Sequence, residues 1–274
     1  MNAVVSIQHV FGDTLRHWRG HRRLSQLELA MHAEVSQRHL SFLESGRAQP
    51  SREMVLKLAE ALELPLRETN TLLKAARFAP VFGASALDEA DMQPVRTALG
   101  LMLAHHEPYP AVVVDACWNL IDANTALHRL FGLVGNMQDM SERIAPGQPP
   151  NVLRMTFHPA GLQPHIANFA EIAPLLINRS FRDCHAHPQL APILEEILDY
   201  PGMPSRWKIP DYGLVAPPLL TMDLAAGGQR CKIFTTITTF GTPQDVTTDE
   251  LRVEMFFPAD EASAQLLKAL AAST

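Results

Sequence analysis

Apolar residues recur at helical spacing through the first 77 residues. Phe11, Leu15 and Trp18 form the first stripe and predict a helix over residues 11–23. Gly46 and Pro50 stand where one helix is expected to stop and the next to start. The remaining stripes predict four more helices, over residues 26–33, 37–45, 52–62 and 66–76. We therefore expect an all-α N-terminal domain of five helices over residues 1–77.

Two of these helices are short, and each opens on a serine. Ser25 and Glu28 fit the S-x-x-E capping box, and Ser36 stands before Gln37 as a second N-cap. Two capped helices joined by a tight connection are typical of a helix-turn-helix, whose second helix presents its first residues to DNA base edges. The pattern predicts a DNA-binding domain.

A stretch rich in small residues follows the helical segment. It contains Pro80 and Gly83, so we expect a linker over residues 78–92. The apolar spacing over residues 93–106 then predicts a helix that connects the two domains or dimerises.

The last two thirds of the chain mix strand and helix patterns. Short β-branched runs over 111–115 and 118–122 predict a hairpin, and Gly227-Gly228 predicts the turn of another. We expect helices over 124–131, 164–178 and 188–198, and strands over 213–224, 229–240 and 251–257. This order predicts an α+β PAS-like domain over residues 93–274, in which an antiparallel sheet and its helices enclose a small-molecule pocket.

The charge is divided between the two segments. The chain carries a net charge of −6, but residues 1–77 hold 11 Lys and Arg against 8 Asp and Glu, and the remainder holds 12 against 21. The net positive charge therefore coincides with the helix-turn-helix pattern, as phosphate binding requires.

Composition excludes several other classes of protein. No apolar run reaches the roughly 18 residues of a membrane span, and the segment before Val10 lacks the cationic start of a signal peptide. Three widely spaced cysteines argue against a disulfide framework. We expect a cytoplasmic, nucleoid-associated protein with no membrane partner.

The N-terminal motif resembles a known family of repressors. The chain reads R-x-x-x-x-L-S-Q-x-x-L-A from Arg19, and then V-S-Q-R-x-L-S-x-x-E-x-G-R-x-x-P from Val35 to Pro50. This is similar to the phage-repressor-like Xre family of helix-turn-helix regulators. The resemblance implies DNA-contacting roles for Gln26, Gln37, Arg38, His39, Ser41, Phe42, Arg47 and Arg52.

These roles agree with the chemistry of the side chains. Gln26 suits a phosphate contact, whereas Gln37 suits adenine and Arg38 suits guanine in the major groove. Phe42 is expected either to contact a thymine methyl group or simply to pack. Arg47 is expected on the DNA backbone.

Two further positions concern the structure of this domain. Arg19 and Glu44 resemble the family's internal ion pair, and we interpret them as structural. The family usually places Gly in the turn where this chain has Glu34. A left-handed backbone there costs Glu up to about 1 kcal/mol relative to Gly.

Motifs in the remaining chain resemble the MmyB-like transcription regulators. They are R-x-x-N-x-L-L-x-A-A-x-F-A-P from Arg67, P-Y-P-A from Pro108, D-x-x-W-N from Asp115, N-x-A from Asn124, N-x-L-R from Asn151 and H-P-x-G-L from His158. This resemblance implies a ligand-binding PAS-like domain and a fatty-acid-like or other apolar metabolite as the bound molecule, with no other cofactor.

A PAS pocket needs apolar walls and a few polar anchors. Candidate walls are Trp118, Phe157, Phe169, Met222 and Phe234, and candidate anchors are Asn124, Arg154, His158 and Asn168. The alternative for each aromatic residue is ordinary core packing. Arg154 suits a carboxylate ligand, although a surface salt bridge is the alternative, and His158 is equally suited to a capped turn before Pro159.

Metal binding and catalysis have only weak support. The run Asp183-Cys184-His185-Ala186-His187 collects metal ligand types, but no second cluster stands at metal-like spacing. Cys184 beside a histidine is a formal nucleophile pair without a surrounding signature. We expect neither a metal site nor an enzyme.

Together these patterns predict a bacterial transcription regulator. It is expected to act as a homodimer that binds a double-stranded DNA operator and whose PAS-like domain senses a small apolar ligand. The alternative is a DNA-binding protein whose C-terminal domain serves only dimerisation, without a ligand.

Overall fold

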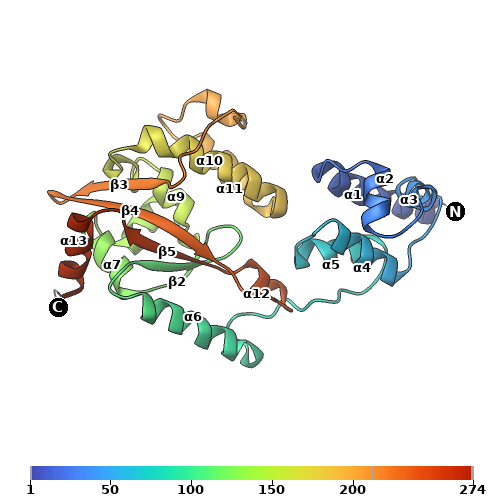
Figure 1. Cartoon of the computed structure of the whole chain (residues 1–274), viewed down its shortest axis with the longest axis horizontal. Coiled ribbons are helices and arrows are strands. Elements are labelled where there is room, and N and C mark those ends of the chain that lie inside the picture. The colour runs from blue at the N-terminus through green and yellow to red at the C-terminus, as the bar shows by residue number, and fades with distance from the viewer. Residues whose placement is uncertain (1, 212, 273–274) are drawn as a thin grey trace. The chain divides into compact units, whose positions relative to one another are not determined.

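The computed structural model describes residues 2–211 and 213–272, and these form two compact units (Figure 1). The first comprises the residues up to Ala86 together with Thr242–Asp249. The second comprises Leu87–Gly241 together with the residues from Glu250 onward. A short segment from late in the sequence thus belongs to the N-terminal unit.

The first unit is helical, as predicted. Its N-terminal part consists of α1 (Asn2–His21), α2 (Gln26–His32), α3 (Gln37–Glu44), α4 (Arg52–Ala61) and α5 (Leu66–Ala75). Ser25, Ser36 and Ser51 cap α2, α3 and α4 by accepting hydrogen bonds from backbone N–H groups three residues later, at 3.1–3.2 Å. The fully buried core includes Leu15, Leu29, Leu40, Leu43, Leu58 and Leu72.

One glycine in α1 sets the approach of α1 to α3. A Cβ atom at Gly12 would lie 2.4 Å from the carbonyl oxygen of Glu44. Glycine therefore permits the backbones of α1 and α3 to pack in contact, which holds the second helix of the helix-turn-helix against the first helix of the unit.

The second unit contains a five-stranded antiparallel sheet in the order β2-β1-β5-β4-β3. The strands are β1 (Ala111–Val114), β2 (Leu120–Ala123), β3 (Thr221–Ala226), β4 (Gln229–Thr238) and β5 (Arg252–Pro258). The turn between β3 and β4 is Gly227-Gly228, with φ of +58° and +73°, values that suit glycine. The predicted α+β class with an antiparallel sheet is confirmed.

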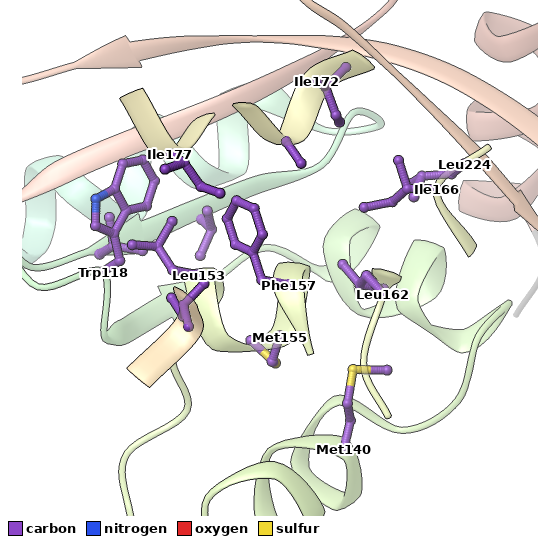
Figure 2. Close-up of a cluster of buried hydrophobic side chains, with 14 of the residues drawn as sticks. Trp118, Met140, Leu153, Met155, Phe157, Leu162, Ile166, Ile172, Ile177 and Leu224 are labelled. Carbon is purple, nitrogen blue, oxygen red and sulfur yellow. The ribbon is translucent and has the colours of Figure 1, made fainter. Parts of the chain in front are cut away.

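Helices pack on this sheet from both sides. They are α6 (Gln93–His106), α7 (Thr125–Gly132), α8 (Met137–Ile144), α9 (Val152–Phe157), α10 (Phe169–Ala186), α11 (Ala191–Leu198) and α13 (Glu261–Ala272). On one face, Leu99 and Leu103 of α6 pack against Val113 and Val253. On the other, a larger core gathers around Phe157 and Ile177 (Figure 2). Among the described helices, none is long and apolar enough to cross a membrane.

Several boundaries differ from the sequence prediction. The strand expected over 213–224 begins only at Thr221, because Pro217 and Pro218 lack the N–H groups that a ladder needs. Helix α10 continues through Pro174 to Ala186, well beyond the expected end at residue 178. Helices α8, α9, α13 and the short α12 (Val246–Glu250) were not predicted.

Candidate functional site: a DNA-binding surface and a ligand pocket

The N-terminal end of α3 is an exposed polar surface. Gln37 and Arg38 are exposed, and His39 and Ser41 are half-buried on the same short helix. The Arg38 guanidinium carbon lies 5.4 Å from the ring centroid of Phe42. Phe42 therefore packs beneath Arg38 and limits its conformations, a role that the sequence left open.

Two more arginines lie near α3. Arg47 follows the helix and Arg52 begins α4, and both are exposed. Within residues 2–211 and 213–272, neither side chain forms an ion pair with a carboxylate. Their charges remain available to an anionic partner such as a phosphate backbone.

The ion pair that holds α3 is deeply buried. Arg19 Nε lies 2.5 Å from Glu44 Oε1, its Nη2 lies 3.0 Å from Oε2, and Glu44 is 2% exposed. Gln26 Nε2 donates to the same carboxylate at 2.8 Å. Burial raises the pKa of Glu44, but the hydrogen bonds from Arg19 and Gln26 outweigh it and lower that pKa. Gln26, expected on a phosphate, here directs one amide N–H to the interior.

The turn between α2 and α3 contains the backbone strain expected from the sequence. Glu34 has a φ of +51°, in the left-handed region that favours glycine. Lys57 Nζ lies 2.9 Å from Glu34 Oε2, an exposed contact that gives the glutamate a partner. The turn keeps the tight helix-turn-helix connection despite the absence of glycine.

The second unit contains a cavity of about 470 Å³ between the sheet and its helices. This volume lies in the range of small-molecule pockets. Most of the lining is apolar, and representative residues are Leu127, Met137, Leu153, Met155, Ile172 and Leu176. The expected wall residues Trp118, Met222 and Phe234 lie in this lining.

Polar residues also line the cavity, and we call the part of the lining around Trp118 its polar end. Arg179 of α10 and Glu254 of β5 line it together with Trp118, and the Arg179 guanidinium carbon lies 4.8 Å from the Trp118 ring centroid. Burial raises the pKa of Glu254, which Arg179 and a hydrogen bond with Thr235 only partly oppose. Arg179 therefore places a cationic group beside Trp118 in this lining, next to a carboxyl group whose pKa is raised.

The indole of Trp118 has an unused hydrogen-bond donor. Among the described residues, Trp118 Nε1 is the one buried side-chain nitrogen or oxygen without a hydrogen-bond partner. Trp118 has a φ of +65° and lies in the turn between β1 and β2. The Asp115 carboxylate stabilises this turn by accepting hydrogen bonds from Cys117 N at 2.8 Å and Asn119 N at 2.9 Å. Figure 2 shows the indole at the edge of the buried cluster, with its ring nitrogen in blue. A buried donor without a partner is suited to bind an acceptor atom of a ligand.

The polar anchors expected from the sequence have partners in the fold and lie outside the cavity lining. Arg154 Nη2 lies 2.7 Å from Glu196 Oε2, so the salt-bridge alternative applies. His158 Nδ1 accepts from Ala160 N at 3.0 Å, which is the capped-turn alternative. Asn124 caps α7 through Leu127 N at 3.1 Å.

Asn168 and two aromatic residues are also placed elsewhere. Asn168 Nδ2 donates to Thr221 O at 2.8 Å, and its Oδ1 accepts from Asp223 N at 3.0 Å, so it connects the start of α10 to β3. Phe157 and Phe169 form an edge-to-face pair with ring centroids 5.9 Å apart, and neither is in the cavity lining. Both rings therefore have the core-packing role.

Sequence reasoning missed the polar residues that do line the cavity. Glu254 was detectable in principle, because it is an acidic residue between Val253 and Met255 in a predicted strand. Arg179 gave no such signal, since the predicted helix ended one residue before it.

The run of metal ligand types on α10 has other contacts. Asp183 Oδ2 lies 3.1 Å from Arg252 Nη1 and 3.9 Å from Arg179 Nε. Burial raises the pKa of Cys184 to about 11, which disfavours the thiolate that a nucleophile needs. Across the part of the chain that the structure describes, no three His, Cys, Asp or Glu side chains are grouped to hold a metal ion.

Comparison with known proteins gives matches in both units. Residues 95–270 match the MmyB-like transcription regulator ligand binding domain, and residues 10–72 match a helix-turn-helix domain. No curated protein matches the chain significantly. A solved structure, described as an RNA-binding Light-Oxygen-Voltage Receptor, is 11% identical with a TM-score of 0.26, and the match covers 97% of this chain and 62% of that chain. The chain therefore spans less than two thirds of that receptor, and a likeness this low has no bearing on fold or function.

The two family matches coincide with the features described above. The first runs from α6 to α13 and includes the sheet and the whole cavity lining, and it covers more than half of the chain. The second includes α2, α3 and their connection. The chain therefore belongs to the MmyB-like transcription regulators, with a helix-turn-helix domain ahead of their ligand-binding domain.

Proposed function

We propose that this protein is a sequence-specific transcription regulator whose affinity for its operator depends on an elongated apolar ligand with an acidic head group, such as a fatty acid. The apolar chain occupies the cavity of about 470 Å³, and the head group lies at its polar end. The observation that carries the proposal is the buried, unpartnered Trp118 Nε1 beside Arg179. A guanidinium is a preferred partner of a carboxylate, and an indole N–H can donate one further hydrogen bond to it.

On the DNA side, α3 enters the major groove. Gln37 and Arg38 contact base edges there, with His39 and Ser41 nearby, and Arg47 and Arg52 contact the phosphate backbone. We propose that the protein acts as a homodimer on two half-sites about one helical turn apart, in the bacterial cytoplasm. Ligand binding changes operator affinity by about 1–3 kcal/mol, the usual size of such coupling.

The proposal is tested by identifying the molecules that the purified protein carries. The full chain is denatured after native purification, and the released small molecules are identified by mass spectrometry. We expect straight-chain carboxylic acids in near-stoichiometric amount, and a fluorescence titration should then give saturable binding of dodecanoate but weaker binding of dodecanol. An empty protein that binds neither compound would favour a C-terminal domain that only dimerises.

A further inference from the structure

The connection between β4 and β5 belongs to the N-terminal unit. Thr242–Asp249 contains most of α12 and is part of the first compact unit, whereas both flanking strands are part of the second. Both ends of the connection therefore continue into strands of the second unit, whereas the connection itself folds with the helices of the first unit. An ordinary surface loop lies on the same unit as the two strands that it connects.

The first half of this connection pairs with residues just after the helical bundle. Val246 N donates to Gly83 O at 2.8 Å, Ser85 N donates to Asp245 Oδ2 at 3.0 Å, and Thr247 Oγ1 donates to Ser85 O at 2.8 Å. A Cβ atom at Gly83 would lie 2.9 Å from Asp245 Oδ2, so the Asp245 side chain packs closely against the backbone at Gly83. Val246 is 1% exposed.

The second half of the connection caps α5. Asp249 Oδ2 accepts from Leu66 N at 3.0 Å, although the two residues lie 183 positions apart. The N-cap residue of α5 is Pro65, which provides no side-chain cap. Asp249 therefore supplies the cap that α5 lacks locally, and removing such a cap typically destabilises a helix end.

Residues 81–82 are tied to the same helix. Asn70 of α5 accepts from Val81 N at 3.0 Å and donates to Phe82 O at 2.8 Å, and it is 7% exposed. Helix α5, residues 81–85 and the connection 242–249 thus form one hydrogen-bonded assembly, which we call the α5 clamp.

The other end of the α5 clamp leads directly to the polar end of the ligand cavity. Arg252 follows Asp249 by three residues, and its guanidinium carbon lies 5.9 Å from the Trp118 ring centroid. Its Nη1 also lies 3.1 Å from Asp183 Oδ2, and Glu254, two residues further, lines the cavity. A head group bound at Trp118 would therefore act on the first residues of β5.

We infer that the α5 clamp transmits the occupancy of the cavity to the DNA-binding helices. This inference rests on the proposed function of the cavity and names the element that couples it to the operator. A head group at Trp118 Nε1 changes the electrostatic surroundings of Arg179 and Arg252, β5 adjusts from Arg252 backward, and Asp249 strengthens or releases the cap of α5. The coupling thus acts on α5, which packs in the same core as α3.

The test compares two aspartates that each cap a helix. Asp249→Ala removes the cap of α5, and Asp260→Ala removes the cap of α13, where Ser263 N donates to Asp260 Oδ1 at 2.8 Å within the second unit alone. Hydrogen exchange on the full-length protein should show exchange at the start of α5 about fivefold faster in Asp249→Ala and unchanged in Asp260→Ala.

Operator binding then reports the coupling itself. With dodecanoate as the probe, Asp249→Ala should bind dodecanoate within about twofold of the wild type, but its operator affinity should be the same with and without dodecanoate. Asp260→Ala should keep the ligand-dependent change in operator affinity. An unaltered ligand response in Asp249→Ala overturns the inference.

A second arm requires no ligand and separates this inference from the proposed function. Thr235→Trp places a large side chain in the cavity lining and mimics occupancy. We expect Thr235→Trp to alter hydrogen exchange over residues 66–72 in the wild-type background. In the Asp249→Ala background, adding Thr235→Trp should leave the exchange of these residues unchanged. No change in the single variant, or the same change in both backgrounds, overturns the inference. If the Thr235→Trp variants give the expected exchange but dodecanoate does not bind to the wild type, the proposed ligand is wrong and the inference about the α5 clamp stands.

Discussion

The guanidinium of Arg179 lies over the indole ring of Trp118, with its central carbon 4.8 Å from the ring centroid. The pair comes from α10 and from the turn between β1 and β2, and Trp118 Nε1 beside it is buried without a hydrogen-bond partner. The stacking fixes the guanidinium, so the cation and the indole N–H are both held at one end of an apolar cavity.

Replacing this indole tests the head-group site. We expect Trp118→Phe to weaken the binding of dodecanoate by about tenfold, because the variant keeps an aromatic wall and loses a hydrogen bond worth about 1.5 kcal/mol to a charged acceptor. Isothermal titration measures the affinity, and dodecanol serves as the probe without a charge.

The matched control is Trp207→Phe, since Trp207 is similarly buried and lies outside the cavity lining. It should leave both affinities within about twofold of the wild type. Equal losses for dodecanoate and dodecanol in Trp118→Phe would mean that the indole only packs.

The buried carboxyl of Glu254 gives a pH-dependent prediction. Burial raises its pKa, so the folded protein holds this proton more tightly than the unfolded chain does. The resulting loss of stability is absent below the unfolded-state value of about 4.3, grows as the pH rises towards the raised pKa, and is complete above it. Glu254→Gln should therefore increase the free energy of unfolding at neutral pH but change it little near pH 4.

Urea unfolding at both pH values measures this difference, and Glu171→Gln is the control because Glu171 is exposed. A variant that is less stable than the wild type at neutral pH would show that the ionised Glu254 is a favourable partner of Arg179.

Base recognition is assigned to Arg38. Because Arg38 is exposed at the start of α3 and stacks on Phe42, Arg38→Ala should lose about 1–3 kcal/mol on the preferred operator and relax the choice of base at one position. A selection from randomised DNA measures the preference. An unchanged preference would remove Arg38 from base readout.

Arg47 provides the contrasting case. It is exposed just after α3, and we expect a phosphate contact, so Arg47→Ala should weaken all DNA sequences alike and reduce the salt slope of binding by about 1. Titrations at several salt concentrations, on the operator and on a scrambled duplex, measure both effects. A loss confined to the operator would mean that Arg47 reads bases.

The DNA-binding unit was largely predictable because its determinants are local. Capping serines, helical stripes and Gly46 each act within a few residues, and the positive φ at Glu34 followed from the turn alone. The buried partner of Gln26 was not predictable, because its contact with Glu44 depends on how α2 and α3 pack.

The ligand cavity was predictable as a class of site but not in its polar residues. Trp118 and Met222 belong to strands or turns whose place in the sheet follows from the pattern, and both line the cavity. Arg154 and Asn124 had the right chemistry, yet partners distant in sequence satisfy them: Glu196 for Arg154, and Ala111 N, at 2.9 Å, for the Asn124 side-chain oxygen. Such pairings are set by tertiary packing, which a single sequence does not display.

The central claim is that a molecule in the cavity alters DNA binding, and operator affinity with and without dodecanoate tests it most directly. The measurement uses the full-length protein at one salt concentration, on an operator selected from randomised DNA, after calorimetry has established the dodecanoate concentration that saturates the protein. Saturation is predicted to change operator affinity by about fivefold or more, and Trp118→Phe should need more ligand to reach the same change. An operator affinity that stays the same while the cavity is saturated would contradict the account.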